Sequence, residues 1–74
     1  MFYKLVQNTD FDALEGGMMM TAKEVIAVVY ARGVKDAEIM FEFMKRKGII
    51  YYSSEAVTIE EATREEFDDF IKNS

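Results

Sequence analysis

The first residues alternate loosely between apolar and polar side chains. Residues 2–7, "FYKLVQ", are also rich in residues that favour β-structure, which predicts a strand. The segment that follows carries the turn residues Asn8, Asp10 and Asp12 and ends in the pair Gly16 and Gly17. We therefore expect a loop between this strand and the next element.

A capping box marks the next element. The Thr21 hydroxyl can accept the Glu24 amide proton, and the Glu24 carboxylate can reach back to the Thr21 amide. Met20 and Val25 have the spacing of a hydrophobic staple around that cap. The run from residue 25 to 31 is apolar on every side of a helical wheel, which predicts a buried central helix over residues 21–32, ended by Gly33.

A second helix is predicted from Val34 to about Lys47, with Gly48 as its C-terminal stop. Its apolar positions cover an arc of roughly 220° at about 100° per residue. A one-sided surface helix needs only somewhat more than about 100°. The excess predicts an exposed apolar surface on this helix or an interface with a second copy.

The last third of the chain is predicted to form a β-hairpin and a short helix. Residues 49–52 would form one arm and residues 57–59 the other. Thr63 and Glu66 form a second capping box, and apolar residues follow it at helical spacing. The expected fold is one small α+β domain over residues 1–74: an N-terminal strand, two central helices joined by a tight turn, a β-hairpin and a short C-terminal helix.

The order of these elements resembles a winged helix, and "EVIAVVYARGVKDAEIMFEF" resembles a helix-turn-helix motif. In that resemblance Gly33 is the turn glycine, Val34 is the apolar residue after it, and Ile39 is a buried position of the second helix. Val29 departs from the pattern, which usually has Ala there. The resemblance implies that residues 34–47 form the recognition helix of a DNA-binding regulator.

The outward side of that recognition helix offers little to DNA. It would carry Lys35, Asp36, Ala37, Met40 and Phe41. Base recognition uses Arg, Lys, Asn or Gln, and phosphate contacts need flanking basic residues. The candidate nucleic-acid contacts are Lys35, Lys45, Arg46 and Lys47, although cations in the last turn of a helix also suit its dipole. Such a surface is better suited to protein than to DNA, so DNA binding is the alternative.

The net charge of −5 is concentrated in the last quarter of the chain. Residues 1–54 carry seven acidic and seven basic residues, whereas residues 55–74 carry seven acidic and two basic ones. An acidic segment disfavours nonspecific binding to phosphate backbones. It is either a solvated helix face that aids solubility or a face that enters a basic groove, as a DNA mimic does.

Catalytic and metal-binding chemistry is poorly represented. The sequence has no His and no Cys, so the commonest general base and the thiolate ligands are absent. The carboxylates follow no signature spacing, and the "DFD" at residues 10–12 lacks the later positions of a calcium loop. We therefore expect no enzyme, no cofactor and no metal site.

The sequence favours a non-enzymatic protein-binding or regulatory module with a partner that has a basic surface. Methionines are common on adaptable binding surfaces, and those near residue 18 can join the second helix in an apolar patch. In general character the chain is similar to phage-encoded inhibitors that occupy a host or defence protein. A structural homo-oligomer is a further alternative. We expect a soluble cytoplasmic protein (host cytoplasm if phage-encoded) with no membrane segment. The candidate partner-binding residues are Met18, Met19, Asp36, Met40, Phe41, Met44, Glu65, Glu66, Asp68 and Asp69.

Overall fold

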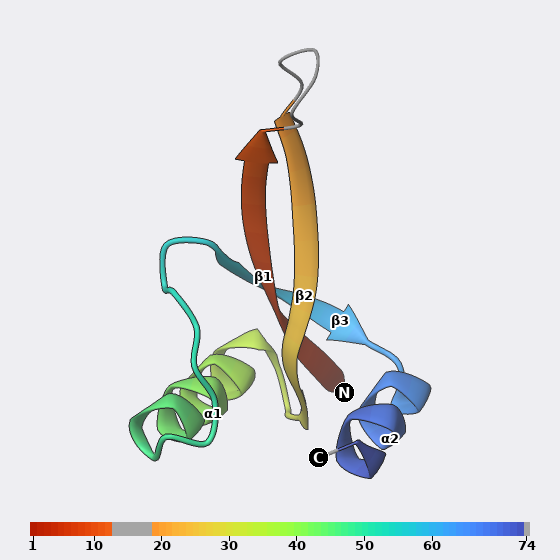
Figure 1. Cartoon of the computed structure of the whole chain (residues 1–74). Coiled ribbons are helices and arrows are strands. Elements are labelled where there is room, and N and C mark those ends of the chain that lie inside the picture. Colours follow the sequence, from red (N-terminus) through yellow and green to blue (C-terminus); the bar gives the residue numbers. More distant parts are fainter. Residues whose placement is uncertain (13–18, 74) are drawn as a thin grey trace.

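The computed structural model describes residues 1–12 and 19–73, with side chains for residues 1–9 and 21–73. In chain order, the elements are β1 (Phe2–Asp12), β2 (Met19–Tyr30), α1 (Val34–Arg46), β3 (Val57–Ala62) and α2 (Arg64–Lys72). The three strands form an antiparallel sheet. β1 and β2 make a long ribbon whose far half extends beyond both helices (Figure 1).

β1 is the central strand, because the strands follow the order β2-β1-β3. Phe2 pairs with Tyr30 on one side and with Ala62 on the other. Directly paired residues point to the same face of a sheet, so alternate residues of β1 define its two faces. The register with β2 shifts between Leu5 and Val6, which leaves Ile26 as the extra residue of a bulge.

The predicted helix over residues 21–32 is wrong, because this segment belongs to strand β2. The Thr21–Glu24 capping box does not form: these residues pair with Asp10 and Gln7 of β1. An apolar run with no polar side fits a strand that is buried on both faces as well as it fits a buried helix. Here Val28 and Val29 point to opposite faces and are both buried, and their branched side chains favour the strand.

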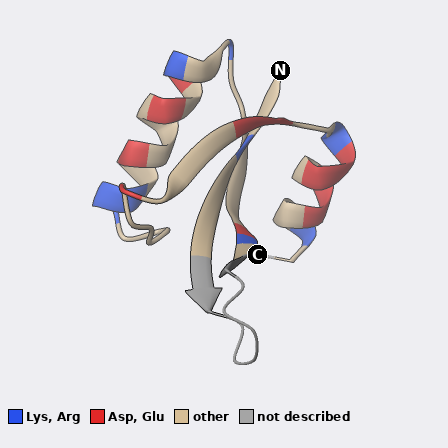
Figure 2. Ribbon diagram, turned by 90° about the horizontal axis from the view of Figure 1, so that it is seen from above, with Lys and Arg blue, Asp and Glu red and all other residues tan. Residues whose placement is uncertain are grey.

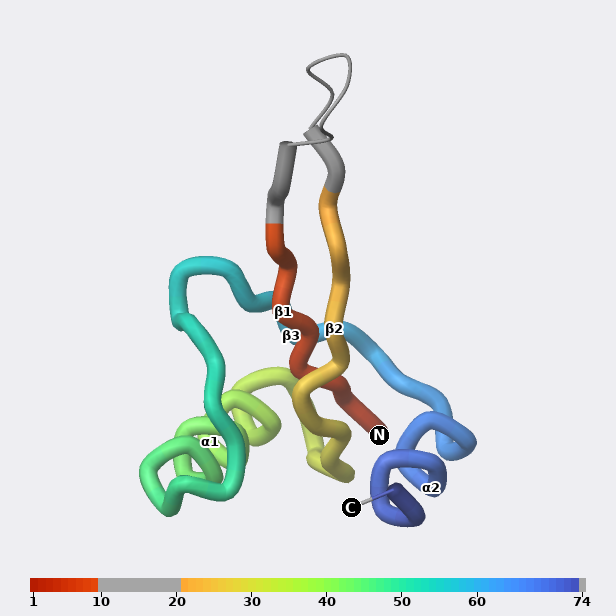
Figure 3. Tube along the Cα trace, in the orientation of Figure 1, coloured from red at the N-terminus to blue at the C-terminus, as the bar shows by residue number. Residues whose placement is uncertain are grey.

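The predicted hairpin of residues 49–52 with residues 57–59 is also wrong. β3 pairs with β1 instead, and residues 49–52 form no strand. α1 ends in a Schellman motif: Gly48 has a φ of +74°, its N–H donates to the carbonyl of Lys45 at 3.1 Å, and Ile49 N–H donates to the carbonyl of Met44 at 2.9 Å. This turn sends the chain back beside α1 (Figure 3) and buries Ile50 in the core.

These two corrections overturn the predicted winged-helix-like fold. Only α1 lies between the first pair of strands and β3, and α2 follows β3 directly. The two helices lie on either side of the strands (Figure 2). The region that resembles the first helix of a helix-turn-helix is therefore a strand in this structure.

α1 begins at Val34, as the sequence predicts, but a different side of it is buried. Phe41 and Ala37 belong to the core together with Tyr3 and Leu5 of β1, and Phe41 is only 1% exposed. Ile39 and Phe43 are 65% and 57% exposed. The resemblance had placed Phe41 outward and Ile39 inward. The helix packs on the face of the sheet that carries Tyr3 and Leu5, and the side of α1 turned to this face is the buried one.

α2 covers the opposite face of the sheet, on which the even-numbered residues of β1 lie. Its N-terminus is the predicted capping box: Glu66 N–H donates to Thr63 Oγ1 at 3.1 Å, and Thr63 N–H donates to Glu66 Oε1 at 3.2 Å. The ring of Phe67 lies 5.1 Å from that of Phe2. Lys4 Nζ lies 2.8 Å from Glu66 Oε2, so one carboxylate both caps α2 and ties it to β1.

The opposite surroundings of two phenylalanines on α1 give a first prediction. Phe41→Ala should destabilise the fold by about 3–5 kcal/mol, because it leaves a cavity under the sheet. Phe43→Ala, its matched control on the exposed side, should change stability by no more than about 0.5 kcal/mol. Urea denaturation followed by circular dichroism measures both, and Phe41→Leu serves if the alanine variant does not fold. Equal losses at the two positions would contradict this packing.

The second prediction concerns the cap of α2. Thr63→Ala removes the acceptor of the Glu66 amide and should destabilise the fold by about 0.5–2 kcal/mol. Thr63→Ser keeps that acceptor and should retain most of the stability. Thermal and urea unfolding of both variants and of the unchanged protein measure the difference. If Ser were as costly as Ala, the hydroxyl would not be acting as a cap.

Candidate functional site

A hollow lies between α1 and strands β1 and β3, and we call it the α1–β3 groove. It has a volume of about 420 Å³. Its floor is apolar and comes from Leu5 and Phe41, while Val57 and Ile59 form the wall on β3. Its other lining residues are Val34, Glu38, Glu42, Tyr52 and Ser54.

Regular spacing brings these side chains together. Glu38 and Glu42 are four residues apart on α1 and therefore lie one above the other on the same side of the helix. Val57 and Ile59 are two residues apart on β3 and therefore point to the same face of the sheet. Tyr52 comes two residues after buried Ile50, in the segment that the Schellman turn sends back along α1. Helix, strand and returning segment thus form three sides of one groove.

The rim of the groove is negatively charged. Glu38 and Glu42 are both exposed, and neither has an ion-pair partner among the residues that the structure describes. The pKa of the Tyr52 hydroxyl is raised above its ordinary value, first by burial and then by the negative charges of Glu42 and Glu38. The two carboxylates therefore act on the interior of the groove as well as on the solvent side.

Lys45 contacts two of the residues that line the groove. Its Nζ donates to Ser54 Oγ at 3.2 Å and lies 4.6 Å from the centre of the Tyr52 ring. These contacts hold the ammonium group at the C-terminal end of α1. The remaining groove combines an apolar floor with two carboxylates at its edge, which suits a ligand with an apolar stem and a cationic head.

The structure describes only the α1 part of the methionine patch expected from the sequence, and those side chains are half-buried or buried. Met18 lies outside the described residues, and Met19 is in β2 with no described side chain. Met40 and Met44 are half-buried and pack against the core, and Phe41 is part of the groove floor. The exposed apolar side chains of α1 are others, chiefly Ile39 and Phe43.

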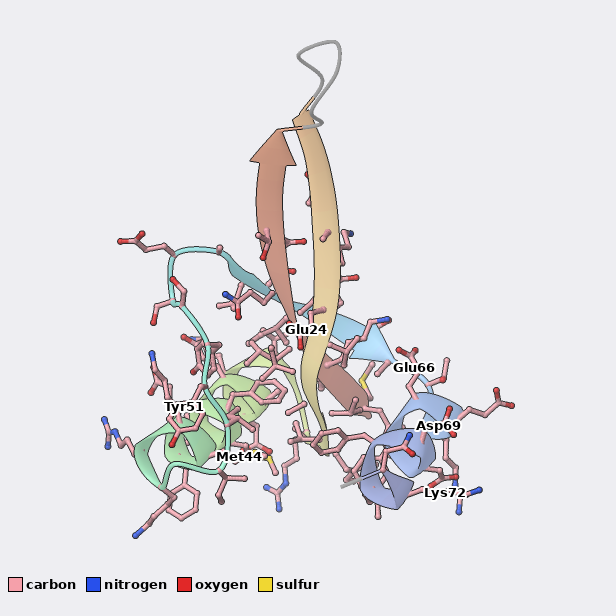
Figure 4. All side chains as sticks on the ribbon, viewed as in Figure 1. Glu24, Met44, Tyr51, Glu66, Asp69 and Lys72 are labelled. Atoms are coloured by element: carbon pink, nitrogen blue, oxygen red, sulfur yellow. The ribbon has the colours of Figure 1, made fainter. Side chains whose placement is uncertain are left out.

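Most of the predicted acidic residues lie on α2, one of the two helices that carry acidic side chains (Figure 2): Glu65, Glu66, Asp68 and Asp69. Glu66 is engaged with Lys4 and Thr63, and these hydrogen bonds, with that from Lys4 the stronger, hold the pKa of its carboxyl below the ordinary value. Glu65, Asp68 and Asp69 are exposed on α2, and Asp68 lies 4.0 Å from Arg64. Figure 4 shows Glu66 at the end of α2 nearest the sheet and Asp69 further along the helix.

Asp36, a further candidate, has a local role, because its carboxylate accepts the Arg32 backbone N–H at 3.1 Å just before α1. The candidate nucleic-acid contacts do not form one surface. Lys35 is at the start of α1, whereas the other three lie at its end. Lys45 is bound to Ser54, Lys47 lies 5.6 Å from the Phe43 ring centre, and Arg46 is exposed.

The residues that sequence reasoning missed are Glu38, Glu42 and Tyr52. The i, i+4 spacing of the two acids was visible in the predicted helix, and like charges at that spacing cost roughly 0.2–0.5 kcal/mol on an isolated helix. The position of Tyr52 had no comparable signal, because it depends on the turn at Gly48.

Comparisons with protein-family models, with curated proteins and with solved structures found no match to this chain. None of the helices in the described part of the chain has the length and apolar character needed to cross a membrane. In the same residues, no group of three or more acidic side chains is arranged to hold a metal ion.

The groove gives a third prediction, on the ionisation of Tyr52. Glu42→Gln should lower the Tyr52 pKa towards its ordinary value, and Glu38→Gln should lower it less, because Glu42 has the larger effect. Part of the upward shift should remain in both variants, since burial is its first cause. Titration of ring-labelled tyrosine by NMR measures this shift.

Glu65→Gln is the matched control for that titration, because it removes one negative charge from α2 rather than from the groove. It should leave the Tyr52 curve unchanged. An unchanged curve in a Glu38→Gln/Glu42→Gln variant would mean that the carboxylates do not act on the phenol.

Proposed function

We propose that this chain is a protein-binding module that captures a lysine or arginine side chain of a partner in the α1–β3 groove. The observation that carries the proposal is the pair of carboxylates, Glu38 and Glu42, which lie above an apolar floor and have no ion-pair partner in the part of the chain that the structure describes. A buried apolar floor alone would suit many ligands. The acidic pair at its rim selects for cationic ones.

Lysine fits this combination in both of its parts. Its aliphatic stem can lie on Leu5 and Phe41 while its ammonium group stays at the rim between the carboxylates. Binding also relieves the repulsion between Glu38 and Glu42. Arginine fits by the same logic and can bind a carboxylate through two parallel hydrogen bonds.

The overall charge supports the same class of partner. The net charge of −5 and the exposed carboxylates of α2 attract a basic surface over distances of about 10 Å at ordinary ionic strength. This long-range attraction raises the rate of association, whereas the groove supplies close contacts that slow dissociation. A module of this kind regulates or inhibits its partner by occupying that partner's basic surface.

A second candidate is self-association through the outer side of α1. Ile39 and Phe43 are one helical turn apart and both exposed. Two copies could cover these side chains against each other. The groove would stay open in such a dimer, because Glu38 and Glu42 lie on a different side of the helix.

The fourth prediction tests capture of a cation. A fluorescent derivative of acetyl-Lys-Val-Lys-Val-Lys-Val-amide should bind, and the same peptide with Glu in place of Lys should not. Glu38→Gln/Glu42→Gln should weaken binding of the lysine peptide about tenfold, which corresponds to about 1.4 kcal/mol for two solvent-facing pairs. Fluorescence anisotropy titrations measure the dissociation constants.

The matched control is Glu65→Gln/Asp69→Asn, which makes the same change in net charge on α2. It should slow association slightly and leave the dissociation rate as it was. Equal weakening by the two double variants would show that overall charge, and not the groove, binds the peptide.

A further inference from the structure

The outer edge of β3 is free within the described residues. β3 pairs with β1 on one side, and the strand order places no strand on its other side. Asn8 N–H donates to the carbonyl of Ala56 at 2.8 Å, which continues the β1–β3 register by one pair. Pairs that exchange hydrogen bonds alternate with pairs that do not in an antiparallel ladder.

That alternation identifies the groups that point outward. Thr58 and Glu60 fall in the hydrogen-bonded positions, so their backbone groups face β1. The N–H and C=O groups of Val57, Ile59 and Glu61 therefore face away from the sheet. No backbone bond outside the sheet joins these three residues to another part of the described chain.

The free edge and the groove share the same residues. Val57 and Ile59 present their backbone groups at the edge and their side chains to the groove. A strand that paired with this edge would direct every second side chain to the face on which α1 lies, because paired residues share a face. Its side chains on that face would then point towards the groove that Glu38 and Glu42 line.

The two edges of the sheet differ in their protection. β2 contains Lys23 and a bulge at Ile26, and both features discourage pairing with another strand. β3, "VTIEEA", contains no Lys and no Pro, and its register with β1 is regular. Its charges are Glu60 and Glu61, which repel a second copy of the same edge and favour a basic strand.

We propose that the partner segment binds in extended form, as a fourth strand on the outer edge of β3, with its basic side chains directed into the α1–β3 groove. This inference rests on the proposed function and adds the conformation of the partner. Addition of a strand to a free edge is an established mode of peptide recognition, in which the main chain gives affinity and alternate side chains give specificity. β3 has six residues, so a hexapeptide of about 20 Å matches it in length.

The fifth prediction uses two N-methylated forms of acetyl-Lys-Val-Lys-Val-Lys-Val-amide. In an antiparallel pair the residues that face the groove also donate their N–H groups to β3. N-methylation of the three lysines should therefore weaken binding at least about tenfold, whereas N-methylation of the three valines should change it less than about twofold. The reverse pattern would support a parallel strand on the same edge.

Amide hydrogen exchange by NMR gives an independent readout with the unmodified peptide. Exchange at Val57, Ile59 and Glu61 should slow on binding, while exchange along β2 should stay the same. Equal effects of the two methylation patterns, or protection along β2 instead, would overturn strand addition at β3.

The outcomes separate this inference from the proposed function. A lysine peptide that binds and is weakened by Glu38→Gln/Glu42→Gln, but responds equally to both methylation patterns, contradicts only the extended conformation. A peptide that fails to bind, or binds equally to the charge-matched α2 variant and the groove variant, contradicts both.

Discussion

The first half of β1, residues 2–7, lies between two strands and two helices, and the rest of the structure depends on this constraint. Tyr3 and Leu5 face α1, whereas Phe2 and Lys4 face α2. The same strand carries the hydrogen bonds of β2 on one side and β3 on the other. A short chain without disulfides can complete a core in this way, because one strand is shared by every layer.

The groove follows from that arrangement. α1 packs on the sheet through Ala37 and Phe41, which lie on one side of the helix. Glu38 and Glu42 lie on a side of α1 that lines the groove opposite Val57 and Ile59 of β3. The position of the groove is thus set by core packing, and its charge is set by two surface residues that the packing does not need.

Signals from neighbouring residues predicted several helix ends correctly. Predictions of whole elements were wrong where contacts between residues distant in the sequence determine the structure. The Thr63 cap, the start of α1 at Val34 and the stop at Gly48 each depend on neighbouring residues, and all three are found. The prediction of a helix over residues 21–32 was wrong because an apolar run without a polar side fits both a buried helix and a buried strand. The prediction of a hairpin between residues 49–52 and 57–59 was wrong because β3 pairs with β1, which is distant in the sequence. The spacing of Glu38 and Glu42 could be read from the sequence. Their place beside a groove could not, because the facing wall is formed by Val57 and Ile59 of β3.

The pairing of β1 with β3 also has a consequence for the order of folding. Phe2 pairs with Ala62, and Lys4 binds a carboxylate 62 residues further along the chain. The β1–β2 ribbon can form early, since its strands are close together in the sequence, but one edge of β1 stays open until residues 57–62 have been synthesised. Contacts of such long range slow folding and expose an unpaired strand while they are missing. Translation speed and chaperone access should therefore affect the yield of this fold.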